Sequence, residues 1–551
     1  MEVASGVFSR RRLAGLVLAI IACQQSLTPS LLPRSWVAQG IITGAAMLAF
    51  YAVGSVLAGL ASLTGLFARV PRERLRQWRV FAGWTAVASV PVLLILSIPG
   101  RQGEWRALGY DTGDRFLYVG AVIVAYAVVV LGGLLGWGLR TLYRRVFRGV
   151  SRLLPWSIAG LVSLALTVTV VTLAANELAY KRFMDGVNTA RADADTELSQ
   201  EDPRPPTVPV RSGVADSLVG WEELGREGRR FVTRAPSVAE LERYSGRPAM
   251  DPIRVFVGRA VAPSDAERAD IAVRELERTG AFERSTLLLV TPTGTGWVNE
   301  QIVQPIEYFT AGDAATVAVQ YSHLPSPVAY LSEQEAAVTS ATLLTDAVLR
   351  RIEELPGDAR PRVLVAGESL GAYGGNGAFA NLDDLVRRVD GSLWVGAPPM
   401  AHLRREAEAR RDGGSPQIRP SIARLPEVVA GGRPSEFADT DATHAFLQFA
   451  DDPIVWWDLR LAIRRPDWLA EPLDPRVKPD VRWRPVTTFL QLTADQIVGT
   501  EFGEGWGHRY GSMPLVVWYE TLDPVGWDQA RLHTLRRHLD EIADSFHGPV
   551  A

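Results

Sequence analysis

The chain has 551 residues, 47% of them hydrophobic, and a net charge of −3, so it is long enough for two or more domains. The charge balance and the lack of a basic block in the second half exclude a nucleic-acid partner from the expected functions. The single cysteine, Cys23, excludes a disulfide within the chain, and no residue spacing requires a metal or an organic cofactor, so neither is expected.

Apolar runs dominate the first 180 residues. A helix needs roughly 20 residues to cross a hydrocarbon core of about 30 Å, and five uncharged runs are long enough. The first follows three arginines, as in a signal peptide, but no small-residue cleavage site follows it, which favours an uncleaved anchor. It is the weakest run, because two glutamines and two prolines interrupt it. The spans predicted for this multi-pass region, residues 1–180, are 13–33, 41–67, 80–100, 116–139 and 153–176.

Arginines collect in two of the loops between these runs. Loops 68–79 and 140–152 carry five arginines each, with one acid in the first and none in the second, whereas loop 101–115 balances three arginines with three acids. Positively charged loops remain on the cytoplasmic side of a membrane. The pattern therefore predicts a cell-membrane protein with a cytoplasmic N-terminus and an extracytoplasmic C-terminal half.

The composition changes after the apolar runs. Residues 181–215 are polar, acidic and proline-rich, which predicts a linker, and a single domain is expected over 216–551. Capping patterns at 264–267 and 332–335 predict the start of two helices, and a last helix is expected over 526–546. The predicted strands are 252–258, 285–292, 315–321, 362–367, 391–398 and 444–450. Short apolar strands that alternate with helices indicate an α/β domain with a mostly parallel sheet.

One motif in this domain has the pattern of a nucleophile elbow. Gly367-Glu368-Ser369-Leu370-Gly371 follows the predicted strand 362–367, and a helix can begin directly after it. A sharp strand-to-helix turn of this kind lifts a serine oxygen clear of the sheet, and the glycines prevent backbone clashes. The context favours Ser369 as a catalytic nucleophile over a structural serine.

A serine nucleophile needs a histidine to accept its proton and an acid to orient the histidine. In this fold the acid and then the histidine follow the serine along the chain. Asp452, at the end of strand 444–450 and before a proline, is the preferred acid, with Asp451 as the alternative. His508, in a glycine-rich loop, is the preferred base among seven histidines.

The negative charge that develops on a substrate oxygen needs two backbone donors. The amide of Leu370, directly after the nucleophile, is the first candidate. The second is expected from the glycine-rich loop that follows strand 285–292, with Gly294 and Thr295 as candidates. A phosphate-binding loop is the rival interpretation, but no Gly-Lys-Ser/Thr sequence follows.

Segments from nearly the whole chain together resemble a known family. They are residues 26–40, 225–232, 293–298, 307–326, 367–375, 390–399, 451–457 and 507–511. The chain thus resembles the actinobacterial membrane-anchored alpha/beta-hydrolase family, sometimes numbered family 9. The resemblance implies a multi-pass N-terminal region, a C-terminal hydrolase domain and a triad of Ser369, Asp452 and His508, and it leaves the substrate open.

These features predict a membrane-anchored serine hydrolase, esterase-like or lipase-like, that cleaves acyl esters through an acyl-enzyme. A lipid bilayer is the expected partner, and the tether favours a lipidic or cell-envelope substrate. Two alternatives stay open: an acyltransferase that uses the same triad on envelope glycolipids, and a non-catalytic membrane scaffold with a hydrolase fold. Trp297, Trp456 and Trp457 are expected either to line an acyl pocket or to be core aromatics.

Overall fold

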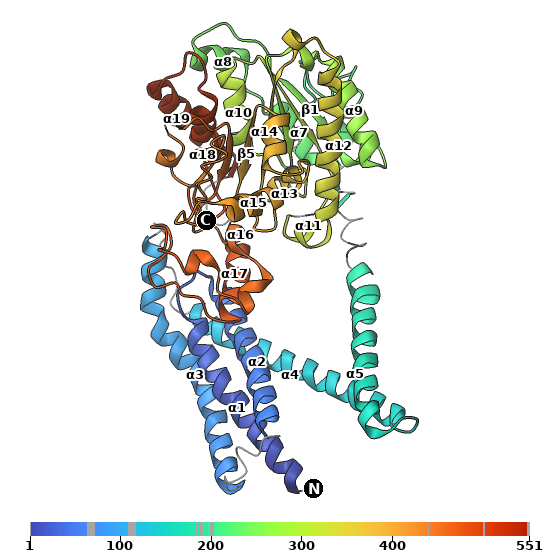
Figure 1. Cartoon of the computed structure of the whole chain (residues 1–551), viewed down its shortest axis with the longest axis vertical. Helices are drawn as coiled ribbons and strands as arrows, with labels where there is room; N and C mark the ends of the chain where they lie inside the picture. The colour runs from blue at the N-terminus through green and yellow to red at the C-terminus, as the bar shows by residue number, and fades with distance from the viewer. Residues whose placement is uncertain are drawn as a thin grey trace. The chain divides into compact units, whose positions relative to one another are not determined.

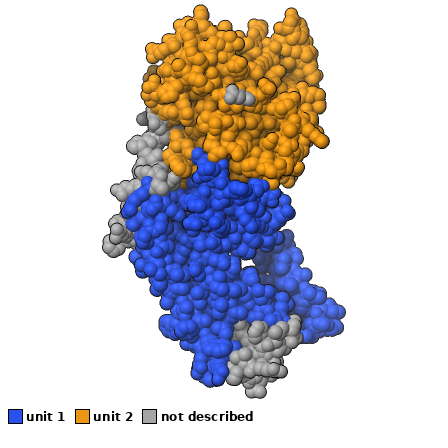
Figure 2. Space-filling model, turned by 60° about the vertical axis from the view of Figure 1, so that its left-hand side comes forward, with its two compact units in different colours: residues 1–183, 458–498 blue, residues 184–457, 499–551 orange. Residues whose placement is uncertain are grey.

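The fold comes from a computed structural model, which describes residues 2–62, 72–107, 117–182, 203–324, 326–438, 440–499 and 502–547, and single positions between 184 and 198. The chain forms two compact units. Unit 1 comprises residues 1–183 and 458–498, and unit 2 comprises residues 184–457 and 499–551 (Figures 1 and 2).

Unit 1 is built from long apolar helices. Helix α1 packs against α2 and α3, and α2 packs against α4 (Figure 1). Their shared core includes Cys23 of α1, Met47 of α2, Leu94 of α3 and Ala125 of α4. The helices are α1 Glu2–Ser26, α2 Trp36–Ala61, α3 Arg72–Ala107, α4 Leu117–Val150 and α5 Trp156–Leu173, which a π-helical turn, η2 Ala174–Lys181, extends.

Four helices in the described part of the chain are long and apolar enough to cross a membrane. They are Trp36–Ala61, Glu73–Arg106, Val119–Val150 and Trp156–Asn176. The prediction of five spans differs at the first run. Helix α1 ends at Ser26, so Pro29 and Pro33 lie in the non-helical segment that follows it. Proline lacks the amide hydrogen that would continue a helix, and the arginines near the start of α1 shorten its apolar stretch.

Residues 458–498 were expected in the C-terminal domain, but they belong to unit 1. We call this segment the insertion. Its helices are η8 Leu459–Ala462, η9 Asp467–Leu469 and α17 Thr487–Val498. Leu490 and Ala494 of α17 pack against Ala38 and Ile42 of α2. These apolar contacts help to hold the insertion in unit 1.

Unit 2 contains a seven-stranded sheet in the order β1-β3-β2-β4-β5-β7-β6, and every pair is parallel. Every residue of β1, β3 and β5 is buried, which requires layers on both faces of the sheet. The strands are β1 Ile253–Val257, β2 Thr286–Thr291, β3 Ala314–Val319, β4 Arg362–Glu368, β5 Gly391–Val395, β6 Val428–Gly431 and β7 His444–Leu447. The expected α/β fold with a mostly parallel sheet is confirmed.

Helices α9, α12 and α13 pack against one another beside the sheet, and α8, α10, α18 and α19 form a second group (Figure 1). The longer helices of unit 2 are α7 Gly225–Thr233, α8 Val238–Ser245, α9 Asp265–Arg278, α10 Glu300–Phe309, α12 Gln334–Glu353, α15 His402–Arg410, α18 Met513–Leu522 and α19 Gln529–His547. The short ones are η3 Glu222–Leu224, η4 Arg259–Val261, η5 Ala281–Glu283, α11 Ser326–Ser332, η6 Gly357–Ala359, α13 Leu370–Asn376, α14 Leu382–Arg388, η7 Pro434–Glu436 and α16 Pro453–Trp456.

Three local features differ from the sequence-based expectations. The second capping pattern was right about a helix start, since α12 begins at Gln334, but wrong about the cap: Ser332 ends α11, where its hydroxyl donates to the Val328 carbonyl. The strand β6, a four-residue strand at the edge of the sheet, was missed. In the predicted linker, Asp195 accepts hydrogen bonds from the Arg226 amide and the Gln320 side chain, so this part of the segment is held by unit 2.

Candidate active site

Strand β4 ends in a tight turn that carries Ser369. The backbone of Ser369 has φ 55° and ψ −118°, a conformation that L-residues rarely adopt. The flanking glycines are sterically required. A Cβ on Gly371 would lie 2.2 Å from the Thr291 carbonyl oxygen, and one on Gly367 would lie 2.5 Å from the Gly371 carbonyl carbon. The strained serine therefore lies between strand β4 and helix α13, and the backbones around this turn come so close together that only glycine fits at positions 367 and 371.

The same edge of the sheet carries the candidate base. The Ser369 amide donates to the carbonyl of Val395, the last residue of β5. The next residue, Gly396, has φ 54°, and a Cβ there would lie 2.6 Å from Cε1 of His508. His508 therefore lies at the carboxyl end of β5, beside β4, the strand that precedes Ser369.

Asp452 holds the imidazole of His508 by a contact with its Nδ1 nitrogen. Its Oδ2 lies 2.6 Å from Nδ1 of His508 and accepts a hydrogen bond of 2.7 Å from the Tyr510 hydroxyl. Its Oδ1 accepts from the Ile454 amide at 2.9 Å. Asp451 faces elsewhere: its Oδ2 accepts from the Gly507 amide, which fixes the loop before His508. Of the two candidate acids, Asp452 is the one in contact with the histidine.

The electrostatics of His508 follow from this arrangement. The side chain is 6% exposed, and burial alone would lower the pKa of the imidazole. The charge of Asp452 and its hydrogen bond outweigh burial, and with Glu368 they raise the pKa of His508 above 6.5. A base with a raised pKa is a stronger proton acceptor once it is neutral.

The far nitrogen of the imidazole, Nε2, is buried and has no hydrogen-bond partner among the described residues. The Ser369 hydroxyl therefore does not bond to it in this structure. Nucleophile–base hydrogen bonds are often long in unliganded enzymes and shorten when substrate binds. Nδ1 bonds to Asp452, so Nε2 is the nitrogen left for proton transfer.

The loop after β2 and the start of α13 offer backbone donors. The amides of Thr293 and Gly296 close the turn by donating to Trp297 and Thr293 carbonyls. The amides of Gly294, Thr295 and Leu370 have no partner within the described part of the chain. Gly371 lies against the backbone of Thr291, which brings the start of α13 up to the end of β2. The three predicted oxyanion residues thus keep unpaired amides at the same edge of the sheet.

The other histidines in the described ranges have different surroundings. His323 pairs with Asp195, and His402 bonds to the Phe379 carbonyl. His444 lies within β7 beside Ser392, where burial lowers its pKa to about 4. His538 stacks on Tyr244 at 4.4 Å between ring centroids.

Two further groups at the site did not stand out in the sequence. Glu368, directly before Ser369, is 8% exposed and accepts a hydrogen bond of 2.5 Å from Asn299. Burial raises its pKa. Tyr510 is buried, stacks on Phe449 and bonds to Asp452. Glu368 lies directly before Ser369 and Tyr510 lies two residues after His508, but no spacing rule marks a tyrosine or glutamate as a supporting residue.

The aromatic candidates separate into two groups. Trp456 is 3% exposed, donates to the Ala450 carbonyl and lies under the guanidinium of Arg404, so it is a core residue. Trp457 is partly exposed and contacts Tyr330 of α11 edge-on. Trp297 is also partly exposed and closes the loop after β2.

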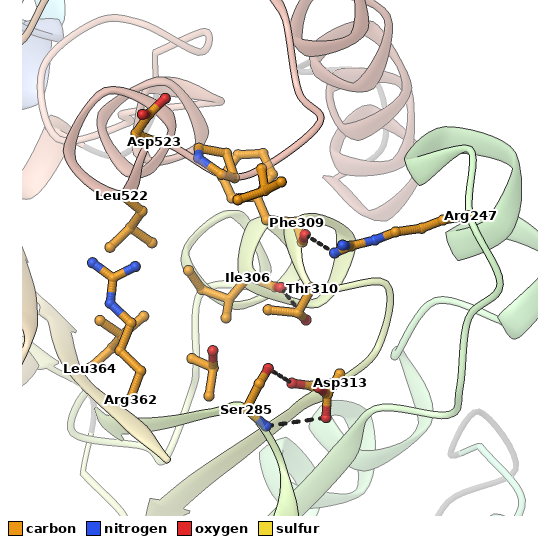
Figure 3. Close-up of a pocket in the computed structure, with 13 residues that line it drawn as sticks. Arg247, Ser285, Ile306, Phe309, Thr310, Asp313, Arg362, Leu364, Leu522 and Asp523 are labelled. Carbon is orange, nitrogen blue, oxygen red and sulfur yellow. Dashed lines mark hydrogen bonds between the residues drawn. The ribbon is translucent and has the colours of Figure 1, made fainter. Parts of the chain in front are cut away.

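A cavity of about 370 Å³ lies at the opposite end of the sheet (Figure 3). It is lined by the starts of β2 and β4, at Thr286 and Arg362, and by Phe309 and Leu522. Ser369 follows the carboxyl end of β4, so this cavity is separate from the candidate active site. No group of three or more His, Cys, Asp and Glu side chains in the described ranges could hold a metal ion.

A parallel sheet with a serine on a strained turn after a central strand, and an acid–histidine pair on loops later in the chain, defines the α/β-hydrolase class. The comparisons agree with this class. A sequence model described as "Alpha/beta-hydrolase family" matches residues 253–535, and one described as "Alpha/beta-hydrolase family N-terminus" matches residues 27–236. The chain belongs to this alpha/beta-hydrolase family, numbered family 9. No curated protein and no solved structure matches it.

Proposed function

We propose that the protein is a membrane-anchored serine hydrolase that cleaves acyl esters, with Ser369, His508 and Asp452 as its triad. The observation that carries the proposal is the serine at φ 55° on the turn after β4, next to a histidine whose Nδ1 lies 2.6 Å from a buried carboxylate. A structural serine has no need of a strained backbone, and such strain is found mostly where function requires it.

In the proposed reaction, Nε2 of His508 accepts the Ser369 proton while the serine oxygen attacks the ester carbonyl carbon. The amide of Leu370 and an amide of the loop after β2, at Gly294 or Thr295, stabilise the resulting oxyanion. The carbon–oxygen bond of the ester then breaks, and the alcohol leaves with the proton from His508. Water, deprotonated by the same imidazole, attacks the acyl-enzyme and releases the acid and Ser369.

Asp452 acts through the histidine. Its carboxylate fixes Nδ1 as the protonated nitrogen and stabilises the imidazolium that forms in each half of the reaction. Tyr510 and the Ile454 amide hold this carboxylate in place.

The membrane helices support a lipidic or cell-envelope ester as substrate. Four apolar helices of the described chain are suited to a bilayer, and a catalytic unit on the same chain stays close to lipid. The arginines of residues 68–79, which include the start of α3, and of residues 140–152, which include the end of α4, support a cytoplasmic position for these helix ends, which would place the catalytic unit outside the cytoplasm of the cell.

The proposal is tested with a fluorophosphonate probe on membranes that contain the full-length protein, followed by peptide mass mapping. We expect an adduct on Ser369 that is absent from Ser369→Ala and forms far more slowly on His508→Ala. An unlabelled wild type, shown by limited proteolysis to be folded, would contradict the enzymatic proposal. Release of fatty acid from vesicles that contain a labelled ester lipid then tests the substrate class.

A further inference from the structure

The turn that carries two of the candidate oxyanion amides lies beside the end of β3. Strand β3 pairs with β1 on one side and β2 on the other, so the loops after all three strands meet at the carboxyl end of the sheet. The turn comprises residues 293–297 after β2, and Gln320 is the first residue after β3. The backbone amide of Gln320 donates to the Val257 carbonyl of β1 at 2.9 Å, which fixes the start of the loop after β3.

The side chain of Gln320 holds one residue of this turn. It is 1% exposed, and its Nε2 donates to the Thr295 carbonyl at 3.1 Å. Thr295 is one of the two turn residues whose own amides have no partner within the described chain. The next residue, Gly296, has φ 89°, and a Cβ there would lie 3.0 Å from Cγ of Gln320. The glycine thus lets the turn lie directly against the Gln320 side chain.

The surroundings of Gln320 permit only one orientation of its side-chain amide. Nε2 faces two oxygens, the Thr295 carbonyl and Oδ2 of Asp195, which lies 2.9 Å away. Oε1 faces a donor, the backbone amide of Arg259, at 3.1 Å. A flipped group would set Oε1 against two acceptors and Nε2 against a donor. The partners of Gln320 therefore keep its donor directed at the turn.

Asp195 supports the Gln320 amide from the other side. Its Oδ2 also lies 3.1 Å from Nδ1 of His323, and its Oδ1 accepts from the Arg226 backbone amide at 3.0 Å. Burial alone would raise the pKa of Asp195, but the hydrogen bonds from His323, Gln320 and Arg226 outweigh burial and lower it. The carboxylate is thus ionised at neutral pH, and a charged acceptor binds the Gln320 amide more strongly than a neutral one.

We propose that Gln320 is a positioning residue for the oxyanion hole: supported by Asp195, it fixes the turn 293–297 so that an amide of the turn faces the substrate oxygen beside Ser369. This inference rests on the proposed function, and the residues that carry it all belong to unit 2. Donors that are already in place stabilise a developing charge best, because they need not reorganise during the reaction. Loss of Gln320 then gives a slow enzyme even when the triad is intact.

The test compares Gln320→Met with Gln304→Met in membranes that contain the full-length protein. Methionine is similar in length to glutamine and removes its hydrogen bonds. Gln304 of α10 is 4% exposed and donates to the Arg234 carbonyl and to Glu300, so it is a buried glutamine with two donated bonds that do not reach the turn. Fluorophosphonate labelling of Ser369 is followed by peptide mass at several probe concentrations. The data give a maximal rate and a half-saturating concentration for each variant.

The maximal rate is the quantity that an oxyanion donor should control. During labelling the serine oxygen bonds to phosphorus as fluoride leaves, and charge builds up on the phosphonyl oxygen in the transition state. Loss of one oxyanion donor costs about 100-fold to 1,000-fold in rate, and a misplaced donor keeps part of its effect, so we expect Gln320→Met to lower the maximal rate by roughly 10-fold to 100-fold. The half-saturating concentration should stay the same, because the interaction is made only in the transition state. Gln304→Met should match the wild type in both quantities.

The outcomes separate the inference from the proposed function. An unchanged maximal rate in Gln320→Met overturns the inference, while labelling of the wild type at Ser369 still supports the proposed function. Equal slowing by Gln304→Met also overturns the inference, because the effect is then general. A wild type that is never labelled at Ser369 overturns the proposed function and the inference together.

The His508→Ala background shows which part of the site Gln320 serves. An oxyanion hole still contributes to the rate when the base is absent. We therefore expect Gln320→Met to slow the residual labelling of His508→Ala by a factor similar to that in the wild type. If the effect disappears in this background, Gln320 acts through the base, which contradicts the inference.

Hydrogen exchange provides a readout that does not depend on activity. The amides of Thr293 and Gly296 close the turn, so Gln320→Met should speed exchange in a peptide that covers 293–298. A peptide from β4, 363–368, should exchange as in the wild type. Exchange of 293–298 that is as slow as in the wild type counts against the inference.

Asp195→Ala is the second variant if Gln320→Met does not fold. It removes one acceptor of the Gln320 side-chain amide and leaves the contact with the Thr295 carbonyl. We expect the maximal rate to fall by roughly threefold, again with the same half-saturating concentration. An unchanged maximal rate in folded Asp195→Ala would remove Asp195 from the support of the turn and overturn the inference in this form.

Discussion

Two buried aspartates, Asp452 in unit 2 and Asp495 in unit 1, have different surroundings and are suited to different roles. Asp452 of unit 2 has partners at 2.6 to 2.9 Å, and one of them is an imidazole whose second nitrogen is unpaired within the described chain. Asp495 of unit 1 contacts Ser30 and, at 3.8 Å, Arg34, whose guanidinium is also bound to backbone carbonyls. The first arrangement leaves a group free to react, whereas the second is suited to holding a segment in place.

The comparison is tested most strongly by Asp452→Asn. Loss of the carboxylate leaves His508 in the wrong tautomer, and in serine hydrolases this costs about 10⁴-fold in rate. We expect a reduction of that order in labelling at Ser369. The matched variant is Asp451→Asn, which alters the contact with the Gly507 amide but not the hydrogen bond to His508, and it should stay within about tenfold of the wild type. The reverse ranking of the two variants would make Asp451 the acid.

Gly371→Ala is expected to have the next largest effect, on stability. A Cβ at this position would lie 2.2 Å from the Thr291 carbonyl oxygen, and overpacking of this kind costs about 1–3 kcal/mol or more. We expect a clear fall in the melting temperature of the detergent-solubilised protein. Gly413→Ala, where a Cβ meets nothing within 4 Å, is the control and should melt like the wild type. Equal melting of the two variants would show that the elbow is more open than described.

Tyr510→Phe should have a smaller effect. It removes the hydrogen bond that the hydroxyl donates to the Asp452 carboxylate and the one that it accepts from the Phe449 amide, and it keeps the ring that stacks on Phe449. A hydrogen bond to a charged group is worth about 1.5–3 kcal/mol, so we expect labelling to slow by about tenfold or somewhat more. The melting temperature, measured in parallel, should fall by a few degrees, because the buried Phe449 amide loses the hydroxyl to which it donates. A rate equal to that of the wild type would remove Tyr510 from the support of the site.

The smallest expected change is in the pH dependence of Glu368→Gln. Only neutral His508 can accept the serine proton, so labelling should rise with pH as the protein passes through the raised pKa of His508, above 6.5. The charge of Glu368 contributes to that rise in pKa. Its removal lowers the pKa, and the acid limb of the rate profile should move to lower pH. A limb that moves to higher pH, or stays in place, contradicts the described electrostatics.

Much of unit 2 could be predicted from local pattern. Apolar segments predicted six of the seven strands, because a strand buried on both faces must be apolar along its length. The elbow at Ser369 was recognisable because its two glycines are a steric requirement of the turn. Asp452 was preferred over Asp451 because a proline follows it, and Asp451 stayed open because the direction of two adjacent aspartates depends on the folded backbone.

The sequence by itself determined the apolar helices, the parallel sheet and the nucleophile elbow, since each follows from periodicity or from steric limits within a few neighbouring residues. Only the tertiary structure decided that residues 458–498 belong to unit 1 and that Tyr510 supports Asp452. The reason is physical. Asp495 and Ser30 are far apart in the chain, and the burial that makes their contact matter exists only once the helices have packed.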